Sequence, residues 1–229
     1  MKKTVRDVEL KGKKVLCRCD FNVPMKDGEI TDDFRIVSSL PTVKYLIEQG
    51  ARVILMSHMG KPKGEPKPEL SLGPVALRLT ELLGQEVKLI SCPTVISDSV
   101  REMAEGLSDG EVMLLENTRY RAEETKSEEP FTGELASLGE LFVNDAFGTA
   151  HRDHSSTAGI ARYLPTVSGF LIEKEVKFLG DALDKPERPF VAIMGGAKVG
   201  DKIPVIENLM KKVDTIIIGG GMTLSLIHI

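Results

Sequence analysis

Short apolar runs rich in β-branched residues recur along this chain, and most are separated by amphipathic stretches long enough for a helix. Such alternation is typical of βαβ units, because two parallel strands need a long crossover between them, usually a helix. The sequence therefore predicts an α/β fold with a doubly wound, Rossmann-like parallel sheet. The predicted strands of this sheet are residues 15–19, 52–57, 87–90, 111–116 and 141–146.

Residues typical of helix ends mark three helices between these strands. In the first, Pro41 suits the opening turn and Gly50 the left-handed position that follows the last turn. The other two helices are predicted at 73–84 and 97–106. The charged run 123–130 is most simply a solvated loop that leads to a further helix.

A second domain is predicted to begin near residue 186. A long amphipathic helix at 169–184 is broken by the Lys-Pro-Glu-Arg-Pro run at 185–189, after which the pattern of strands and helices starts again. We expect three parts, which are a first domain at 1–168, an interdomain helix at 169–185 and the incomplete start of a second domain at 186–229. This last part should form a βαβ unit, with strand 190–194, helix 202–212 and strand 215–218.

The composition limits the classes of function. The chain has 229 residues and a formal net charge of −4, whereas a general nucleic-acid binder carries a basic excess. Its cysteines, Cys17, Cys19 and Cys92, match neither a disulfide framework nor the spacing of a zinc site. No apolar run is long enough to span a membrane, and no signal-like apolar segment follows the basic N-terminus. We therefore expect a cytoplasmic protein with no nucleic-acid or membrane partner.

Polar residues come directly after most of the predicted strands, at the edge of the sheet where α/β folds bind their ligands. Arginines stand out among them, because a guanidinium group offers a planar fork of donors that matches phosphate or carboxylate. Several arginines at one edge of the sheet, in a chain that is acidic overall, predict a local site for a small, multiply charged anion. Asn and Asp side chains would bind the hydroxyl groups of that anion. The candidates are Asp20, Asn22, Arg35, Ser57, His58, Asn117, Arg119, Asn144, Asp145, His151 and Arg152.

Each of these residues also has a simpler interpretation. A single arginine after a strand is usually a solvated surface charge, and His58 or His151 alone fits an ordinary satisfied histidine. Asp20 and Asn22 fit a plain turn, which short polar side chains favour. The agreement among several strand ends favours the anion site over these alternatives.

Six motifs, in this order and spacing, resemble the phosphoglycerate kinase family. Together they extend over nearly the whole chain, and the ordered series is far more specific than any one motif. They are Arg-x-Asp-Phe-Asn-Val-Pro at 18–24, Asp-x-x-Arg at 32–35, Ser-His-x-Gly-x-Pro at 57–62, Glu-Asn-x-Arg at 116–119, Asp-Ala-Phe-Gly-x-Ala-His-Arg at 145–152 and Gly-Gly-Ala-Lys-Val-x-Asp-Lys at 195–202.

The resemblance implies an enzyme of glycolysis that transfers a phosphoryl group reversibly between 1,3-bisphosphoglycerate and ADP, giving 3-phosphoglycerate and ATP. It also implies a monomeric full-length enzyme and catalytic roles for Arg35 and Lys198. The residues that the resemblance implies for binding the triose acid are Asp20, Phe21, Asn22, Arg35, His58, Met59, Gly60, Lys61, Arg119 and Arg152.

The second domain is implied to bind ATP or ADP with Mg²⁺. Lys198 would follow the transferred group, and Lys202 would contact the nucleotide phosphates. The glycines at 195–196 and 219–221 each follow an apolar strand, where backbone N–H groups can approach an anion closely. The resemblance accordingly implies that Gly219, Gly220 and Gly221 contact the nucleotide. Neither glycine group is a P-loop signature.

Two departures from the family pattern affect these expectations. Lys61 stands where the family usually has arginine, so the charge is kept while the bidentate fork is lost. Residues 224–229 look like a non-native tail, in place of the family's next helix. We therefore expect this chain to bind the triose acid without turnover. The alternatives are a non-catalytic binding module for a phosphorylated three-carbon acid and a fragment that aggregates through its open sheet edge.

Overall fold

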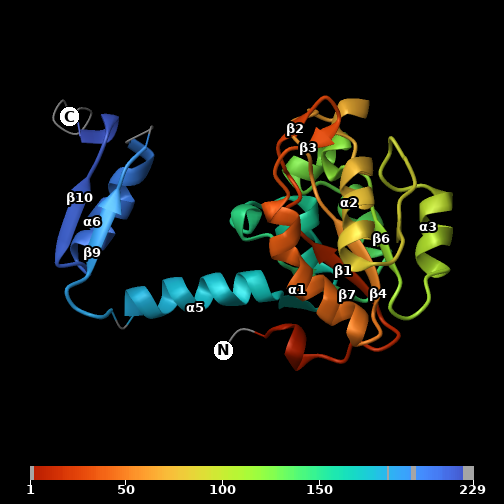
Figure 1. Cartoon of the computed structure of the whole chain (residues 1–229), viewed down its shortest axis with the longest axis horizontal. Coiled ribbons are helices and arrows are strands. Elements are labelled where there is room, and N and C mark those ends of the chain that lie inside the picture. Colours follow the sequence, from red (N-terminus) through yellow and green to blue (C-terminus); the bar gives the residue numbers. More distant parts are fainter. Residues whose placement is uncertain (1–2, 185, 197–199, 224–229) are drawn as a thin grey trace. The chain divides into compact units, whose positions relative to one another are not determined.

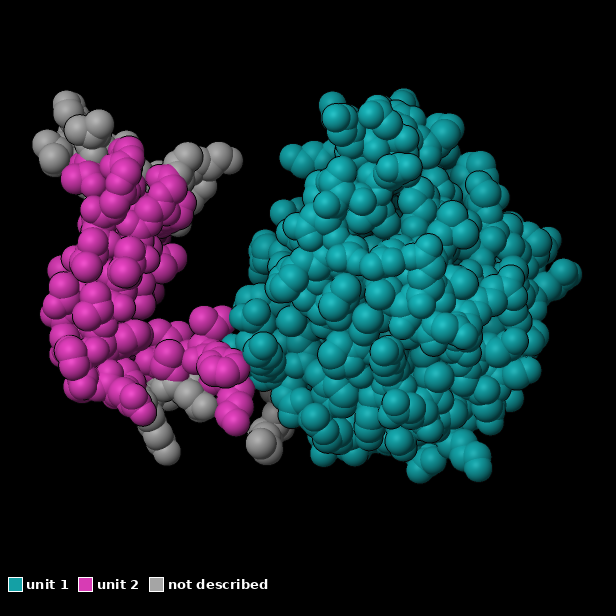
Figure 2. Space-filling view, viewed as in Figure 1, with its two compact units in different colours: residues 1–175 teal, residues 176–229 magenta. Residues whose placement is uncertain are grey.

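The computed structural model describes residues 3–184, 186–196 and 200–223. The chain divides into two compact units, Met1–Glu175 and Val176–Ile229, which Figure 2 shows in different colours. The division falls within helix α5 (Phe170–Asp184). The predicted parts 1–168, 169–185 and 186–229, with the roles implied for them, stay predictions.

The first unit is built on a six-stranded parallel sheet whose strands follow the order β5-β6-β4-β1-β7-β8. This sheet confirms the predicted α/β class, and the five predicted strands are all present. The third predicted strand is the shortest, with only two residues. The strands are β1 (Lys14–Arg18), β4 (Arg52–Met56), β5 (Val87–Lys88), β6 (Val112–Leu114), β7 (Leu141–Asn144) and β8 (Thr166–Ser168).

Helices cover both faces of this sheet, because successive strand residues point to opposite sides and are apolar on both. In β1, Val15 and Cys17 lie in one core cluster and Leu16 in the other. The first cluster also contains side chains of α1 (Phe34–Glu48) and α2 (Gly73–Leu83), which Figure 1 shows beside the central strands. The second contains side chains of α3 (Asp98–Glu105) and α4 (Phe131–Ala136).

Helix α1 begins one and a half to two turns earlier than predicted, so the placement of Pro41 in an opening turn is wrong. Pro41 lies inside the helix. The helix begins at Phe34, whose N–H donates a 2.9 Å hydrogen bond to the carboxylate of Asp32. Ile36 and Leu40 are buried against the sheet, so the apolar face that stabilises the helix already begins before the proline.

The charged run at 123–130 is not a simple solvated loop. Its first part belongs to a short 3₁₀ helix, Ala122–Lys126, and the side chain of Glu124 in that helix is fully buried. The expected helix does follow, as α4. The hydrogen bonds of Glu124, described below, explain why a carboxylate in a charged run turns inward.

A small hairpin after β1 was not predicted. It pairs β2 (Met25–Lys26) with β3 (Glu29–Ile30) in antiparallel register. The turn between them is Asp27-Gly28, with φ angles of 51° and 84°. Aspartate followed by glycine is a typical hairpin turn, because both positions need positive φ.

The second unit contains the predicted strand, helix and strand. In it, β9 (Val191–Met194) and β10 (Thr215–Ile218) pair in parallel and α6 (Ile203–Met210) connects them. Several apolar side chains of this unit are exposed, including Ile193 and Met210. No helix among the described residues has the length and apolar character that a membrane crossing requires.

Candidate functional site

The carboxyl ends of β1, β4 and β7 lie together, at the point where the strand order reverses. β4 and β7 flank β1, with Arg18 paired in register to Met56 on one side and to Asn144 on the other. In α/β folds, loops that leave such an edge run in different directions and leave a crevice where a ligand binds. The sheet topology therefore brings the predicted strand-end residues to one place.

The loop after β1 is tied to the loop after β4. The backbone N–H of Phe21 donates to Oγ of Ser57 at 2.9 Å, and the side-chain oxygen of Asn22 accepts from the N–H of Gly60 at 2.8 Å. Asp20 Oδ1 accepts from the N–H of Asn22 at 3.3 Å, so the plain turn considered for this segment is indeed present. The turn and a ligand site are compatible, because Asp20 has a second carboxylate oxygen.

That second oxygen of Asp20 forms an ion pair with Arg35, which extends from the first turn of α1. The Arg35 side chain is half exposed. A hollow of about 230 Å³ lies beside this pair, and Ser38 and Phe147 are among the residues that line it. Arg35 is thus available to a ligand from this side of the crevice.

A larger cavity of about 500 Å³, here called the basic cavity, lies at the loops after β4, β6 and β7. None of its lining residues carries a carboxylate. Such a concentration of cations without lining anions favours a bound polyanion. The residues that line the basic cavity are Lys61, Lys63, Gly64, Arg119, Arg121, Ala122, Thr125, Lys126, Arg152 and His154.

One wall of the basic cavity depends on a glycine. Gly64 has φ +84°, and a Cβ atom there would lie 2.8 Å from the Cβ of Ala122. The N–H of Gly64 donates to the carbonyl oxygen of Arg119 at 3.2 Å. Glycine therefore allows the loop after β4 to approach the loop that carries Arg119.

Arg119 is largely buried at the inner wall of the basic cavity. Its Nη1 donates to the carbonyl oxygen of Gly60 at 2.8 Å, while its Nε has no hydrogen-bond partner among the described residues. Burial lowers the pKa of this guanidinium, and the neighbouring charges of Arg152 and Arg18 lower it further. Arginine nevertheless remains protonated, so the site holds several close cations.

Arg18 is the residue that sequence reasoning missed, although it stands in the first motif. It is fully buried at the end of β1 and donates from Nε to Oγ of Ser156 at 3.0 Å. Its Nη2 lies 2.9 Å from Nδ1 of His58. Arginine is almost never fully buried unless it is paired, so an arginine inside an apolar strand was the available signal.

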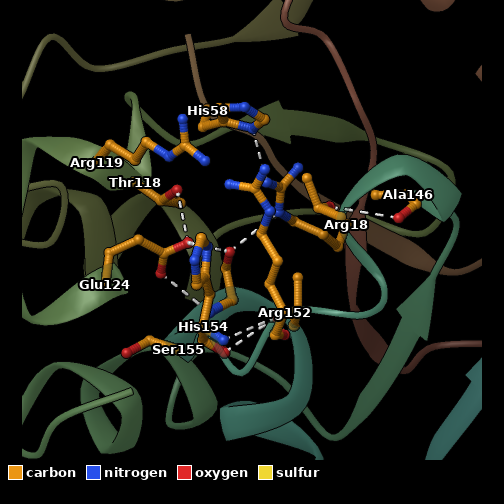
Figure 3. Close-up of polar contacts among 12 residues, drawn as sticks. Arg18, His58, Thr118, Arg119, Glu124, Ala146, Arg152, His154 and Ser155 are labelled. Atoms are coloured by element: carbon orange, nitrogen blue, oxygen red, sulfur yellow. Dashed lines mark hydrogen bonds and ion pairs between the residues drawn. The ribbon is translucent and has the colours of Figure 1, made fainter. Parts of the chain in front are cut away.

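Glu124 is the buried carboxylate of this network. It accepts 2.6 Å and 3.0 Å hydrogen bonds from the hydroxyl and the N–H of Ser156, and a 3.3 Å bond from the hydroxyl of Thr118. His154, for which the sequence offered no role, lies with Nδ1 3.9 Å from the same carboxylate. Figure 3 shows the side chains of Glu124, Thr118 and His154 beside the guanidinium groups of the site.

The two buried histidines of the site are held neutral. Burial lowers the pKa of His58 to about 2, with further lowering by the charges of Arg18, Arg119 and Arg152. The pKa of His154 is also lowered, mainly by burial, although the Glu124 carboxylate acts in the opposite direction. These histidines can therefore donate or accept hydrogen bonds without adding charge to the site.

Other predicted residues play structural parts. The side chains of Phe21 and Met59 are buried in the core, which leaves only their backbone groups for a ligand. Both donors of the Asn117 amide are used by the carbonyl oxygens of Met59 and Leu70, at 2.8 and 2.9 Å. Asp145 caps α5 by accepting from the N–H of Leu171 at 2.8 Å. These contacts fix the loops that carry the cations.

His151 and Lys61 differ from the buried histidines. Both are exposed at the surface, and only Lys61 lines the basic cavity. The Asn144 side chain accepts a 3.1 Å hydrogen bond from the N–H of Ala146, which shapes the loop after β7.

In the second unit, the predicted glycines and Lys202 lie near one another. The N–H of Gly219 donates to Met194 at 2.8 Å, and a Cβ atom built on Gly196 would lie 3.4 Å from Nζ of Lys202. Gly220 has φ +68°. Lys198 lies outside the described residues. Within the described parts of the chain, no group of three or more His, Cys, Asp or Glu side chains is placed to hold a metal ion.

An open parallel sheet with arginines at its point of strand reversal defines the class of this domain, an α/β domain with a cationic strand edge of the kind where such folds bind their ligands. The family model for phosphoglycerate kinase matches residues 5–229. The chain belongs to the phosphoglycerate kinase family.

Relatives and solved structures agree with this membership. The chain is 66% identical over 222 residues to phosphoglycerate kinase of Clostridium botulinum (strain Eklund 17B / Type B) and 64% identical to that of Clostridium perfringens (strain 13 / Type A). Both alignments cover 96% of this chain but 56% of the relative, so the chain spans about half the length of these curated relatives.

Among solved structures, phosphoglycerate kinase from Coxiella burnetii matches with a TM-score of 0.85 and 41% identity, over 96% of this chain and 55% of that one. Phosphoglycerate kinase from Pyrococcus horikoshii OT3 matches with a TM-score of 0.86 and 38% identity, over 96% of this chain and 56% of that one. These similarities confirm the family that the six motifs indicate.

Proposed function

We propose that a protein containing this chain acts as a phosphoglycerate kinase, transferring a phosphoryl group reversibly between 1,3-bisphosphoglycerate and ADP to give 3-phosphoglycerate and ATP. In this proposal the first unit binds the triose acid in the crevice at the ends of β1, β4 and β7. The observation that carries the proposal is the basic cavity, where Arg119 and Arg152 face a space without lining carboxylates.

Charge balance supports a phosphorylated ligand. Arg18, Arg119 and Arg152 all act on His58, so the three guanidinium groups are close together. Figure 3 shows them gathered near that histidine. The buried carboxylate of Glu124 offsets one charge only, and a phosphate group would offset the others through charge-assisted hydrogen bonds.

The chemistry of phosphoryl transfer also fits these residues. Its catalysis is mostly alignment and cationic stabilisation of charge on the transferred group, so no covalent nucleophile is needed. Arg35 would face that group from the first unit, with Asp20 holding its guanidinium in place. Lys198 would follow it from the second unit, and residues Asn22, His58, Gly60 and Lys61 would complete the triose site.

The nucleotide side of the proposal rests on family membership. ATP or ADP with Mg²⁺ would bind the second domain through Lys198, Lys202 and the glycines Gly219, Gly220 and Gly221. A polypeptide of residues 1–229 alone should bind the triose acid without ADP-dependent turnover, because transfer needs donor, acceptor and metal fixed in line. A cytoplasmic, monomeric full-length enzyme belongs to the same proposal. Family membership does not favour the alternative of a pure binding module.

Calorimetric titration of the 229-residue chain with 3-phosphoglycerate tests the proposal. Arg152→Ala should weaken binding by about 1.5–3 kcal/mol, the scale of a hydrogen bond to a charged partner. Arg162→Ala is the matched control, because Arg162 is an exposed arginine that pairs with Asp153 and does not line the basic cavity. Glycerate, which lacks the phosphate, should bind far more weakly. Equal binding of both acids, or equal effects of both variants, contradicts the proposal.

A further inference from the structure

A buried chain of hydrogen bonds runs from a carboxylate to the ring of His58. Glu124 accepts a 2.6 Å bond from the hydroxyl of Ser156, and that hydroxyl oxygen accepts a 3.0 Å bond from Nε of Arg18. Nη2 of Arg18 then lies 2.9 Å from Nδ1 of His58. Arg18, Ser156 and Glu124 are each fully buried, so water does not compete for these bonds.

The direction of the last bond follows from the chemistry of arginine. A guanidinium group has N–H donors and no acceptor, so Nη2 must donate and Nδ1 of His58 must accept. A neutral imidazole that accepts at one ring nitrogen carries its proton on the other. His58 therefore holds its proton on Nε2. No described residue accepts a hydrogen bond from that N–H, which leaves it for a ligand.

The charges around His58 keep its ring neutral as well. They come from the segments after three strands, and each opposes a further positive charge on the ring. Burial is the largest cause of its lowered pKa. The charged groups that lower it further are Arg18 at the end of β1, Arg119 after β6 and Arg152 after β7, and His154 after β7 would do so if it were protonated.

We propose that Arg18, held by Ser156 and Glu124, is a positioning residue that fixes His58 as the neutral Nε2–H tautomer, so that His58 presents one hydrogen-bond donor to an oxygen of the bound acid. The donor role rests on the proposed function, while the tautomer is a property of the ligand-free protein. Arg18 thus acts on the ligand through His58, because it fixes the orientation of the His58 ring. A mobile cation at the surface could not do this.

This arrangement separates two tasks within the cluster. Arg119 and Arg152 line the basic cavity and supply charge to a phosphate. His58 supplies a donor of fixed direction that stays uncharged across neutral pH, because its pKa is lowered to about 2. A neutral donor attracts anions less strongly than a cation does. It therefore distinguishes one bound acid from another mainly by the position of the oxygen that accepts its hydrogen bond.

Nitrogen NMR of the 229-residue chain with ¹⁵N-labelled histidine tests the proposal directly. In the ligand-free chain, the His58 signals, identified by their loss in His58→Gln, should show an unprotonated Nδ1 and a protonated Nε2 from pH 5 to 8. A proton on Nδ1, or an imidazolium forming in that range, overturns the proposal. Adding 3-phosphoglycerate should shift the Nε2–H signal and leave the tautomer unchanged.

Two neighbouring serines supply a matched pair of variants. Ser156→Ala removes the acceptor of Nε of Arg18 and leaves the acceptors of Nη1, which are the carbonyl oxygen of Cys19 and Oγ of Ser57. Ser155→Ala removes an equally buried hydroxyl that bonds Thr132 at 2.8 Å and has no bond to Arg18. Ser156→Ala should mix the two tautomers and weaken 3-phosphoglycerate binding roughly tenfold. Ser155→Ala should leave both unchanged even if it lowers thermal stability. Identical behaviour of the two variants overturns the role assigned to Ser156 and Arg18.

Failure of this inference is distinguishable from failure of the proposed function. A proton on Nδ1 with normal 3-phosphoglycerate binding overturns the inference alone. The Nε2–H tautomer without any 3-phosphoglycerate binding overturns the proposed function and with it the donor role of His58.

Discussion

The side-chain oxygen of Asn22 accepts a 2.8 Å hydrogen bond from the backbone N–H of Gly60, joining the loops that follow β1 and β4. Gly60 is confined in turn, since it has φ +57° and a Cβ atom there would lie 2.8 Å from a methyl group of Leu70. The loop after β4 is thus held from both sides, and Asn22 contributes one of the contacts.

Replacing Asn22 by aspartate separates the loop contact from the charge of the site. Asn22→Asp keeps an oxygen that accepts from Gly60 but adds a negative charge beside the proposed anion. We expect 3-phosphoglycerate to bind roughly tenfold more weakly, equal to about 1.4 kcal/mol. The loss should shrink at high salt, where charges are screened. Calorimetry at two ionic strengths measures both effects, and a loss that is independent of salt would argue against this explanation.

His58 should make stability depend on pH below neutrality. Its pKa is about 2 in the folded state and near 6.5 when unfolded, so the unfolded chain binds more protons between these values. The free energy of unfolding should therefore fall as pH falls below 6.5, by up to about 1.4 kcal/mol per pH unit. The lowered pKa of His154 acts in the same direction.

Denaturant unfolding between pH 5 and 6.5 checks this contribution, because carboxylates remain largely ionised there. His58→Gln should reduce the slope of stability against pH in that range. An unchanged slope in a folded His58→Gln variant would mean that the ring is protonated normally in the native state.

Glu124 should stabilise the fold while weakening anion binding. Glu124→Gln leaves the buried guanidinium of Arg18 without its carboxylate and should lower the free energy of unfolding by about 3 kcal/mol. The amide oxygen of glutamine can still accept from the hydroxyl of Ser156, so the support of Arg18 is kept while the site becomes more positive. 3-Phosphoglycerate should therefore raise the melting temperature by more than in the unmodified chain. Glu102→Gln is the control, because Glu102 is exposed on α3 and does not line the basic cavity. A thermal denaturation series shows both effects, and a smaller ligand-induced shift in Glu124→Gln contradicts the charge argument.

The start of α5 depends on a glycine. A Cβ atom on Gly169 would lie 2.3 Å from Oδ1 of Asp145, the oxygen that accepts from the N–H of Leu171. Gly169→Ala should therefore push this cap away and cost about 1–3 kcal/mol of stability. Gly180→Ala in the same helix meets nothing within 4 Å and should be neutral or stabilising. Equal melting temperatures for the two variants would contradict this role for Gly169.

The sheet could be predicted because its strands are buried on both faces and therefore appear as continuous apolar runs. β1 and β4 illustrate this, with four of five residues buried in each. β8 escaped prediction because it has three residues and only Val167 among them is buried. The Asp27-Gly28 pair is typical of a hairpin turn. The strands on either side have only two residues each, which is too short for a recognisable pattern.

The outline of the site was also predictable, since parallel strands deliver their carboxyl ends to one edge. The buried network behind it was not. Arg18 and Ser156 are 138 positions apart in the chain, and Ser156 and Glu124 are 32 apart. Local sequence pattern carries no information on such pairings, and for this reason the charged run at 123–130 predicts a solvated loop for Glu124. The burial of Arg18 is explained only by the carboxylate of Glu124, which lies far away in the sequence.

Mapping of backbone amide shifts during titration with 3-phosphoglycerate shows which residues surround the bound triose acid. We expect one equivalent of ligand to shift the amide signals of Asn22, Gly60 and Arg119, and glycerate at the same concentration to leave them in place. Signals of 203–218, in the second unit, should stay in place. Shifts confined to the second unit, or none at all in a folded chain, would contradict the assignment of the triose acid to the crevice at the ends of β1, β4 and β7.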